Sequence, residues 1–413
     1  MVALRKGILV WFLVLVAGFK TAGKAADVYT PVVVSALQGS TQPVVGTDGK
    51  QHLVYELVMT NASRAVATLR RIEVVDAQNP AKVLASFEGP ALIAHIHNTG
   101  NMPVEKAEIP FNETRVVLVN FSIAGTPAPG NPATPSRLLH QITLMGTAPG
   151  HRRDEMVEQH YVVAPIEVSA GVPTIGPPLA GTGWVALNGC CEPMGVHRGT
   201  GLPVNGKIYF AQRFAIDWMK LDDAGRMVNG DASKVENYVD YGAEVLAVAD
   251  GTVVETLNTL DEQVPGKLPD PATITLENVD GNHVVIDLGK GLYAFYAHLQ
   301  KDSVLVKEGQ HVKLGQVLGK LGNTGNTSGP HLHFHLMDGP SVLGSSGLPY
   351  EIDGFGLAGA VSAEKFATAP TLEGDWGEGR TKTASERKGQ FPLDLNIVNF
   401  PEQKAAGGGL KAE

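Results

Sequence analysis

The chain has little cysteine and no excess of basic residues. Its 413 residues include only two cysteines, Cys190 and Cys191, and the two are adjacent. Disulfides that link distant segments are therefore excluded, whereas a vicinal disulfide in an oxidising compartment and two buried thiols both stay open. The formal net charge is −9. This charge argues against a nucleic-acid partner and against binding to an anionic membrane surface.

The chain begins with an apolar run that is too short to span a bilayer comfortably. Two basic residues, Arg5 and Lys6, precede an apolar segment at residues 8–19, and small residues follow it. This order is typical of a cleaved export signal. We therefore predict a signal peptide at residues 1–26 and no stable membrane insertion after its removal. The mature chain is expected outside the cytoplasm, in the periplasm or secreted.

The length is too great for one compact core, so we expect at least two domains. Short β-branched runs separated by turns predict an all-β fold. Residues 27–170 are predicted to form an antiparallel β-sandwich-like domain. Residues 171–183 are rich in proline and glycine and are predicted to be a linker. Residues 184–350 are predicted to form a second, antiparallel β-sheet domain, and residues 351–413 a partly disordered C-terminal extension.

Three histidines stand at alternate positions in residues 322–335. His331, His333 and His335 would share one face if this segment were a strand. A strand face with three imidazoles is a poor core, because each ring needs a polar partner. It suits a metal site or proton transfer, since neutral imidazole is both a zinc ligand and a base near neutral pH.

Several segments together resemble the lysostaphin/LytM-type zinc endopeptidases, which cut peptide cross-links in bacterial cell walls. The resemblance covers the second half of the chain and does not include the first domain. The matching segments are residues 213–217, 249–254, 281–287, 296–299, 306–312 and 322–335.

The resemblance implies a fold, a metal and residue roles. It implies an antiparallel LytM-type peptidase sheet in residues 184–350 and a bound Zn²⁺. Asp217 and His333 match the family's metal ligands, while His298 and His331 match its catalytic histidines beside the metal. The implied substrates are peptidoglycan peptides.

The chain departs from the family at one position. Where the family has its first zinc-ligand histidine, four residues before the aspartate, this chain has Arg213. A guanidinium stays protonated and cannot bind a metal ion. Three interpretations follow: His335 or His197 replaces the ligand; the metal binds weakly and Arg213 holds substrate or an oxyanion; or the site is inactive.

The inactive case defines the alternative function, a LytM-type domain that binds the wall or regulates another hydrolase. The pair His283 and Asp287 also has the ligand spacing, but we expect it to lie at the rim or in solvent. His95 and His97 are expected to be structural. The sequence leaves the oligomeric state and the bond that is cut undetermined.

Overall fold

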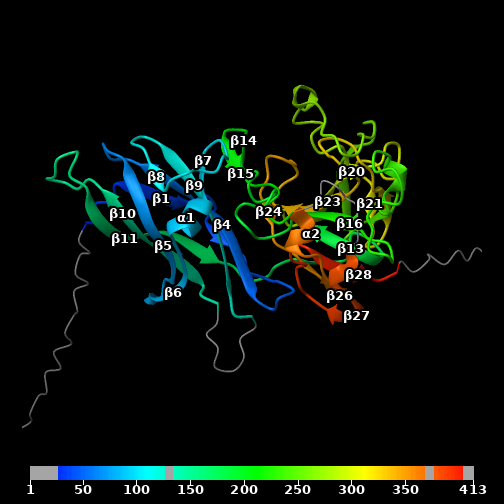
Figure 1. Cartoon of the computed structure of the whole chain (residues 1–413), viewed down its shortest axis with the longest axis horizontal. Coiled ribbons are helices and arrows are strands. Elements are labelled where there is room, and N and C mark those ends of the chain that lie inside the picture. The colour runs from blue at the N-terminus through cyan, green and yellow to red at the C-terminus, as the bar shows by residue number, and fades with distance from the viewer. Residues whose placement is uncertain (1–26, 126–133, 368–375, 403–413) are drawn as a thin grey trace, which may run out of the picture.

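The computed structural model describes residues 27–125, 134–367 and 376–402 (Figure 1). The predicted all-β class is confirmed, because strands in mainly antiparallel sheets dominate these residues. The predicted signal peptide at residues 1–26 lies outside the described residues, as does the tail from residue 403 onward. Within the described part of the chain, no helix is long and apolar enough to cross a membrane.

The first domain is a sandwich of two sheets. One sheet has the order β1-β4-β9-β7 with β3 on β4, and the other has the order β2-β11-β10-β5-β6 with β8 on β5. Alternate side chains point inward, so Leu57 and Val117 of one sheet share a buried cluster with Ile72 and Ile142 of the other. The elements are β1 (Val32–Ala36), β2 (Ser40–Thr41), β3 (Val44–Val45), β4 (Gln51–Asn61), β5 (Ala67–Asp76), β6 (Asn79–Glu88), α1 (Gly89–Ala94), β7 (Ile96–Asn98), β8 (Glu108–Ile109), β9 (Thr114–Ile123), β10 (Arg137–Gly146) and β11 (Val157–Val168).

The second domain is built on one large sheet. Its order within the described residues is β21-β18-β19-β20-β23-β16-β13-β28-β26-β27, with β24 beside β23. The elements are β12 (Thr174–Ile175), β13 (Gly181–Leu187), β14 (Leu202–Val204), β15 (Lys207–Tyr209), β16 (Ile216–Lys220), η1 (Val235–Asn237), β17 (Glu244–Leu246), β18 (Gly251–Leu257), η2 (Pro271–Thr273), β19 (Asn282–Gly289), β20 (Leu292–Leu299), β21 (His311–Val312), β22 (Val317–Lys320), β23 (Leu332–Met337), β24 (Gly347–Leu348), β25 (Glu351–Ile352), β26 (Phe355–Ala360), α2 (Ala363–Ala367), η4 (Gly377–Gly379), β27 (Arg380–Arg387) and β28 (Asn396–Phe400).

Two boundaries differ from the sequence prediction. The predicted linker is packed, because Ile175 and Leu179 are buried in the core of the second domain and β12 pairs with β25. The predicted C-terminal extension contributes β26, β27 and β28 to the main sheet, where β28 pairs directly with β13. Burial of the apolar residues of β28 explains why this segment is ordered: Ile397 and Val398 are both inaccessible to solvent.

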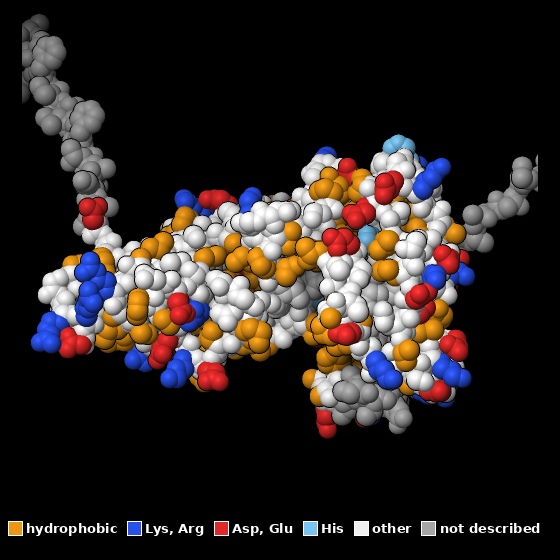
Figure 2. Space-filling view, turned by 90° about the horizontal axis from the view of Figure 1, so that it is seen from above, with side chains coloured by type: hydrophobic (Ala, Val, Ile, Leu, Met, Phe, Trp, Pro, Cys, Tyr) orange, Lys and Arg blue, Asp and Glu red, His pale blue; other side chains and the backbone are white. Residues whose placement is uncertain are grey.

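The two domains share a packed boundary. Val44 and Val54 of the first domain belong to the same buried cluster as Trp184 and Phe391 of the second. A backbone bridge also joins Gly46 to Phe391. In Figure 1 the first domain, in blue through cyan to blue-green, lies beside the second, in green to red. On the face seen in Figure 2, Lys and Arg side chains are interspersed with Asp and Glu.

Candidate metal centre

Strand register brings the central candidates together. In the main sheet β16 lies next to β23, and Asp217 is directly opposite His333 across this antiparallel pair. On its other side β23 pairs with β20, where Ala297 is opposite His333 and His298 follows. Directly opposite residues in an antiparallel pair have Cβ atoms about 5 Å apart. Three neighbouring strands thus bring one carboxylate and several imidazoles to the same part of the sheet.

A third imidazole reaches this carboxylate from a loop. Nε2 of His197 lies 3.2 Å from Oδ2 of Asp217, and Nδ1 of His333 lies 3.0 Å from Oδ1. One donor atom from each of the three residues lies within 4.8 Å of the others, and all three residues are buried. Two imidazole nitrogens and a carboxylate oxygen are the donor types that zinc prefers.

His197, Asp217 and His333 each make a further hydrogen bond to a residue outside this group of three. Nδ1 of His197 donates to the carbonyl oxygen of Ala215 at 3.1 Å, which leaves its Nε2 unprotonated in the neutral ring. Nε2 of His333 lies 3.0 Å from Nδ1 of His335, and when His333 donates there, its Nδ1 is likewise free. Asn188 donates to Oδ2 of Asp217 at 2.7 Å. Such outer contacts orient metal ligands and fix their tautomers.

The charges in this group are strongly coupled. Burial would raise the pKa of Asp217, but the neighbouring His197 and His331 rings hold it well below its usual value. Burial lowers the pKa of His333 to about 4, although Asp217 opposes the change. The pKa of His197 shifts in the opposite direction. Burial lowers it, but attraction to the Asp217 carboxylate outweighs burial, so the pKa of His197 is raised. Asp217 is therefore a carboxylate and His333 a neutral imidazole near neutral pH.

Two further histidines lie beside the three donors. The ring centroids of His298 and His331 are 4.6 Å apart, and Nε2 of His331 lies 3.5 Å from Oδ1 of Asp217. Nδ1 of His298 donates to the carbonyl oxygen of Thr324 at 2.7 Å. Nδ1 of His331 donates to that of Gly329 at 2.8 Å. Their Nε2 atoms are thus the acceptors in the neutral rings.

His298 has two properties of a functional residue. Its φ is 60°, a left-handed conformation that is rare outside glycine and common at active sites. Burial lowers its pKa well below the usual value, and the neighbouring His331 and His333 add to this effect. The ring is therefore neutral near neutral pH.

These residues line a cavity of about 1300 Å³. Asp217, His298 and His331 form part of its wall, together with Gly100 and Asn101 from the first domain. Apolar side chains, including Leu268 and Trp376, line other parts. The cavity is thus bounded by both domains, and its volume is larger than the usual range of about 300–1,000 Å³ for small-molecule sites.

Arg213 does not face this cavity, contrary to the interpretation in which it holds substrate or an oxyanion. Its guanidinium donates to both carboxylate oxygens of Glu56, to Gln38 and to the carbonyl oxygen of Gly347. Only 4% of Arg213 is exposed. Its charge is already paired with a carboxylate of the first domain, and Arg213 is not among the residues that line the cavity.

His197 and His335 were the two candidates to replace the ligand at the position of Arg213. Of these, His197 lies next to Asp217, whereas His335 lies on the far side of the His333 ring. His335 contacts the side of the His333 ring that points away from Asp217. Asn188, which the sequence did not suggest, also reaches the site. No local motif marks it, because its position depends on the fold of residues 188–201.

The other histidines lie elsewhere. His283 donates through Nδ1 to Gly281 and faces Glu255, while Asp287 accepts from the backbone of Gly289. His95 contacts the carbonyl oxygen of Ala91 and the side chain of Asn120, and His97 contacts Asn101. None of these residues belongs to the metal-competent group in the described chain.

Comparison with known proteins identifies one part of the chain. Residues 235–343 match the family described as Peptidase family M23. A segment of 57 residues is 51% identical to the peptidoglycan DD-endopeptidase ShyA of Vibrio cholerae and covers 14% of this chain and 13% of ShyA. A segment of 109 residues is 31% identical to the glycyl-glycine endopeptidase ALE-1 of Staphylococcus capitis and covers 26% of this chain and 25% of ALE-1.

Among solved structures, the catalytic domain of lysostaphin from Staphylococcus simulans is similar over 35% of this chain and 78% of its own, with 23% identity and a TM-score of 0.21. The chain spans well under two thirds of the length of the two curated relatives. The resemblance predicted from the sequence is thus confirmed for one segment: the second half of the chain contains a Peptidase family M23 domain, matched at residues 235–343.

Proposed function

We propose that this protein is a zinc-dependent endopeptidase that hydrolyses peptide bonds in bacterial peptidoglycan. The observation that carries the proposal is the convergence of His197, Asp217 and His333 beside His298 and His331. Both curated relatives described above are named as endopeptidases, one of them for peptidoglycan. The apolar N-terminal segment at residues 8–19 supports export to the envelope, where this substrate lies.

The residues present fit a zinc ion. His197, Asp217 and His333 would supply three donors, and three protein ligands are typical of catalytic zinc, which keeps a further position open. When bound, zinc polarises a carbonyl group and makes water acidic near neutral pH. The hydrogen bonds from His197 to Ala215 and between His333 and His335 orient the rings for this role.

His298 and His331 are proposed to move protons next to the metal. Each ring has its Nδ1 donating to a backbone carbonyl, so each presents Nε2 toward the cavity side. A neutral Nε2 accepts a proton from the attacking water, and the protonated ring then donates to the leaving amine or to a developing oxyanion. Because burial keeps His298 neutral, its Nε2 lone pair is free to accept a hydrogen bond from the attacking water.

The alternative of an inactive wall-binding domain was motivated by Arg213 in the position of a ligand. His197 offers a donor in its place, and Arg213 is paired with Glu56. We therefore keep the peptidase as the proposal and let the experiment decide between the two.

The test is zinc content together with digestion of purified peptidoglycan. We expect the wild-type chain to contain about one zinc ion and to release soluble peptides. His333→Ala should lose both properties, and His331→Ala should retain zinc and lose cleavage. His311→Ala, on an exposed histidine outside the site, is the matched control and should behave as wild type. Wild-type protein that binds sacculi but contains no zinc and releases no peptides would refute the proposal in favour of the alternative.

A further inference from the structure

One carboxylate of the first domain lies between two arginines of the second. Glu56 is on β4, and its exposed fraction is 0%. Arg198 and Arg213 approach it from two separate segments of the second domain, and their exposed fractions are 2% and 4%. All three charged groups are thus removed from solvent at the boundary between the domains.

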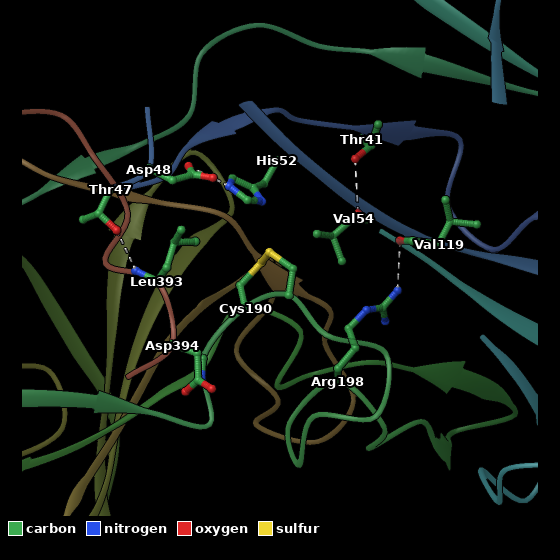
Figure 3. The surroundings of a disulfide bond; sticks show 12 residues. Thr41, Thr47, Asp48, His52, Val54, Val119, Cys190, Arg198, Leu393 and Asp394 are labelled. Atoms are coloured by element: carbon green, nitrogen blue, oxygen red, sulfur yellow. Dashed lines mark hydrogen bonds and ion pairs between the residues drawn. A yellow bond between two sulfur atoms is a disulfide. The ribbon is translucent and has the colours of Figure 1, made fainter. Parts of the chain in front are cut away.

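The contacts are close and use both carboxylate oxygens. Arg213 donates through Nε to Oε1 at 2.9 Å and through Nη2 to Oε2 at 2.6 Å. Arg198 donates through Nη1 to Oε1 at 2.5 Å. Arg198 also donates to the carbonyl oxygen of Tyr55 on β4 and to that of Val119 on β9, so it is bound to two strands of the first domain. Figure 3 shows the bond to Val119. Burial would raise the pKa of Glu56, but the two guanidinium groups hold it below its usual value.

Each arginine is joined through the chain to a proposed zinc ligand. Arg198 directly follows His197, and Arg213 precedes Asp217 by four residues on the way into β16. In the chain between Arg213 and Asp217, the carbonyl oxygen of Ala215 accepts the hydrogen bond that orients the His197 ring. Glu56 therefore binds an arginine in each of two segments, the one that carries His197 and the one that leads to Asp217. These two segments must lie together for His197 and Asp217 to bind the same ion.

The loop that carries His197 depends on such anchors, because it lies outside the sheet. Residues 188–201 contain no strand. At its start the loop is held by Cys190, which is buried in the cluster that includes Val54, and by the backbone N–H of Gly189, which donates to Asp394; Cys190 and its disulfide partner Cys191 are drawn in Figure 3. At its end, Arg198 is the residue bound to Glu56. Without that bond, nothing in strand pairing fixes the distance from His197 to Asp217.

We propose that Glu56 is a positioning residue for the metal centre, through which the first domain completes the zinc site of the second. This inference rests on the zinc site of the proposed function, and it assigns the first domain a role beyond spacing. It also accounts for Arg213, whose guanidinium serves as one of the two partners of Glu56.

The experiment measures zinc affinity of the full chain by competition with a chelator. Glu56→Gln keeps the shape of the side chain and removes its charge, so we expect zinc to bind about tenfold more weakly, in the range typical of outer-shell changes. Arg198→Gln leaves the pair between Glu56 and Arg213 in place and should weaken zinc binding similarly. This variant replaces Glu56→Gln in the test if Glu56→Gln does not fold. Ile142→Ala, in the core of the first domain, is the control for lost stability and should leave zinc affinity within about twofold of wild type.

A double-mutant cycle tests whether Glu56 acts through His197. In a His197→Ala chain, measured with a weaker competitor, adding Glu56→Gln should weaken zinc binding by a smaller factor than in the wild-type background, because only its effect through Arg213 on Asp217 remains. An equal loss in both backgrounds, or an equal loss in Ile142→Ala, would overturn the inference. Zinc binding with the expected coupling but no peptide release would overturn only the proposed function. A wild-type chain that binds no zinc would overturn both.

Discussion

Replacing Arg213 by leucine is expected to destabilise the folded chain severely. Arg213 makes four hydrogen bonds, two to Glu56, one to Gln38 and one to the carbonyl oxygen of Gly347. Removing one partner of a buried ion pair typically costs about 3–5 kcal/mol, because the remaining charge stays in a poorly solvating environment. Arg198 remains beside Glu56 and offsets part of this cost. We therefore expect a loss of about 3 kcal/mol in the free energy of unfolding.

The assay is urea unfolding at pH 7, followed by tryptophan fluorescence. Trp184 and Trp218 are both buried in the second domain and report its unfolding. The cycle of Arg213→Leu, Glu56→Gln and the double variant should show a coupling energy of at least about 1.5 kcal/mol, because Glu56→Gln leaves Arg213 without its carboxylate and Arg213→Leu removes one of the two guanidinium partners of Glu56. A loss below about 1 kcal/mol with no coupling would mean that Arg213 is solvated, and a raised KM without lost stability would place it in the cleft instead.

Three further predictions concern histidines. His197→Ala should weaken zinc binding by at least about 100-fold in a chelator competition, because one of three ligands is lost; an unchanged affinity would mean that another residue binds the ion. His298→Ala should retain zinc but slow peptide release by about 100-fold or more, and equal loss of both would assign it a structural role. Burial lowers the pKa of His140 to about 4, so the unfolded chain takes up this proton first and stability should fall as the pH drops from about 6.5 towards 4. Over that window the contribution approaches about 3 kcal/mol, and His140→Gln should show a smaller decline in urea unfolding; an identical pH profile would contradict this account.

Much of the fold could be predicted from local patterns. In the first domain the β-branched run at residues 115–123 is typical of a strand, and β9 covers it. Residues 272–276 are an exception: their short apolar run by itself favours a strand, but the 3-10 helix η2 occupies its start. There Asp270 caps the turn through the backbone of Ala272, and this local hydrogen bond outweighs the weak strand preference of a short apolar run.

The candidate site was predicted in part. Alternation predicted that His331, His333 and His335 share one face of a strand, and the family resemblance paired His333 with Asp217; in the structure His333 and His335 lie on β23 and His331 directly precedes it. The sequence also named His197 as one of two candidates. It could not choose between them, because a loop residue has no periodicity that reports where its side chain points.

The sequence alone determined the all-β class, the imidazole-rich strand and the family of the second domain, because these depend on residue types at short, regular spacings. Only the tertiary structure decided that His197 reaches Asp217 and that Arg213 is paired with Glu56. The physical reason is that a buried charge must find its partner wherever the fold provides one. Here the partner of Arg213 is 157 residues away, on a strand of the other domain.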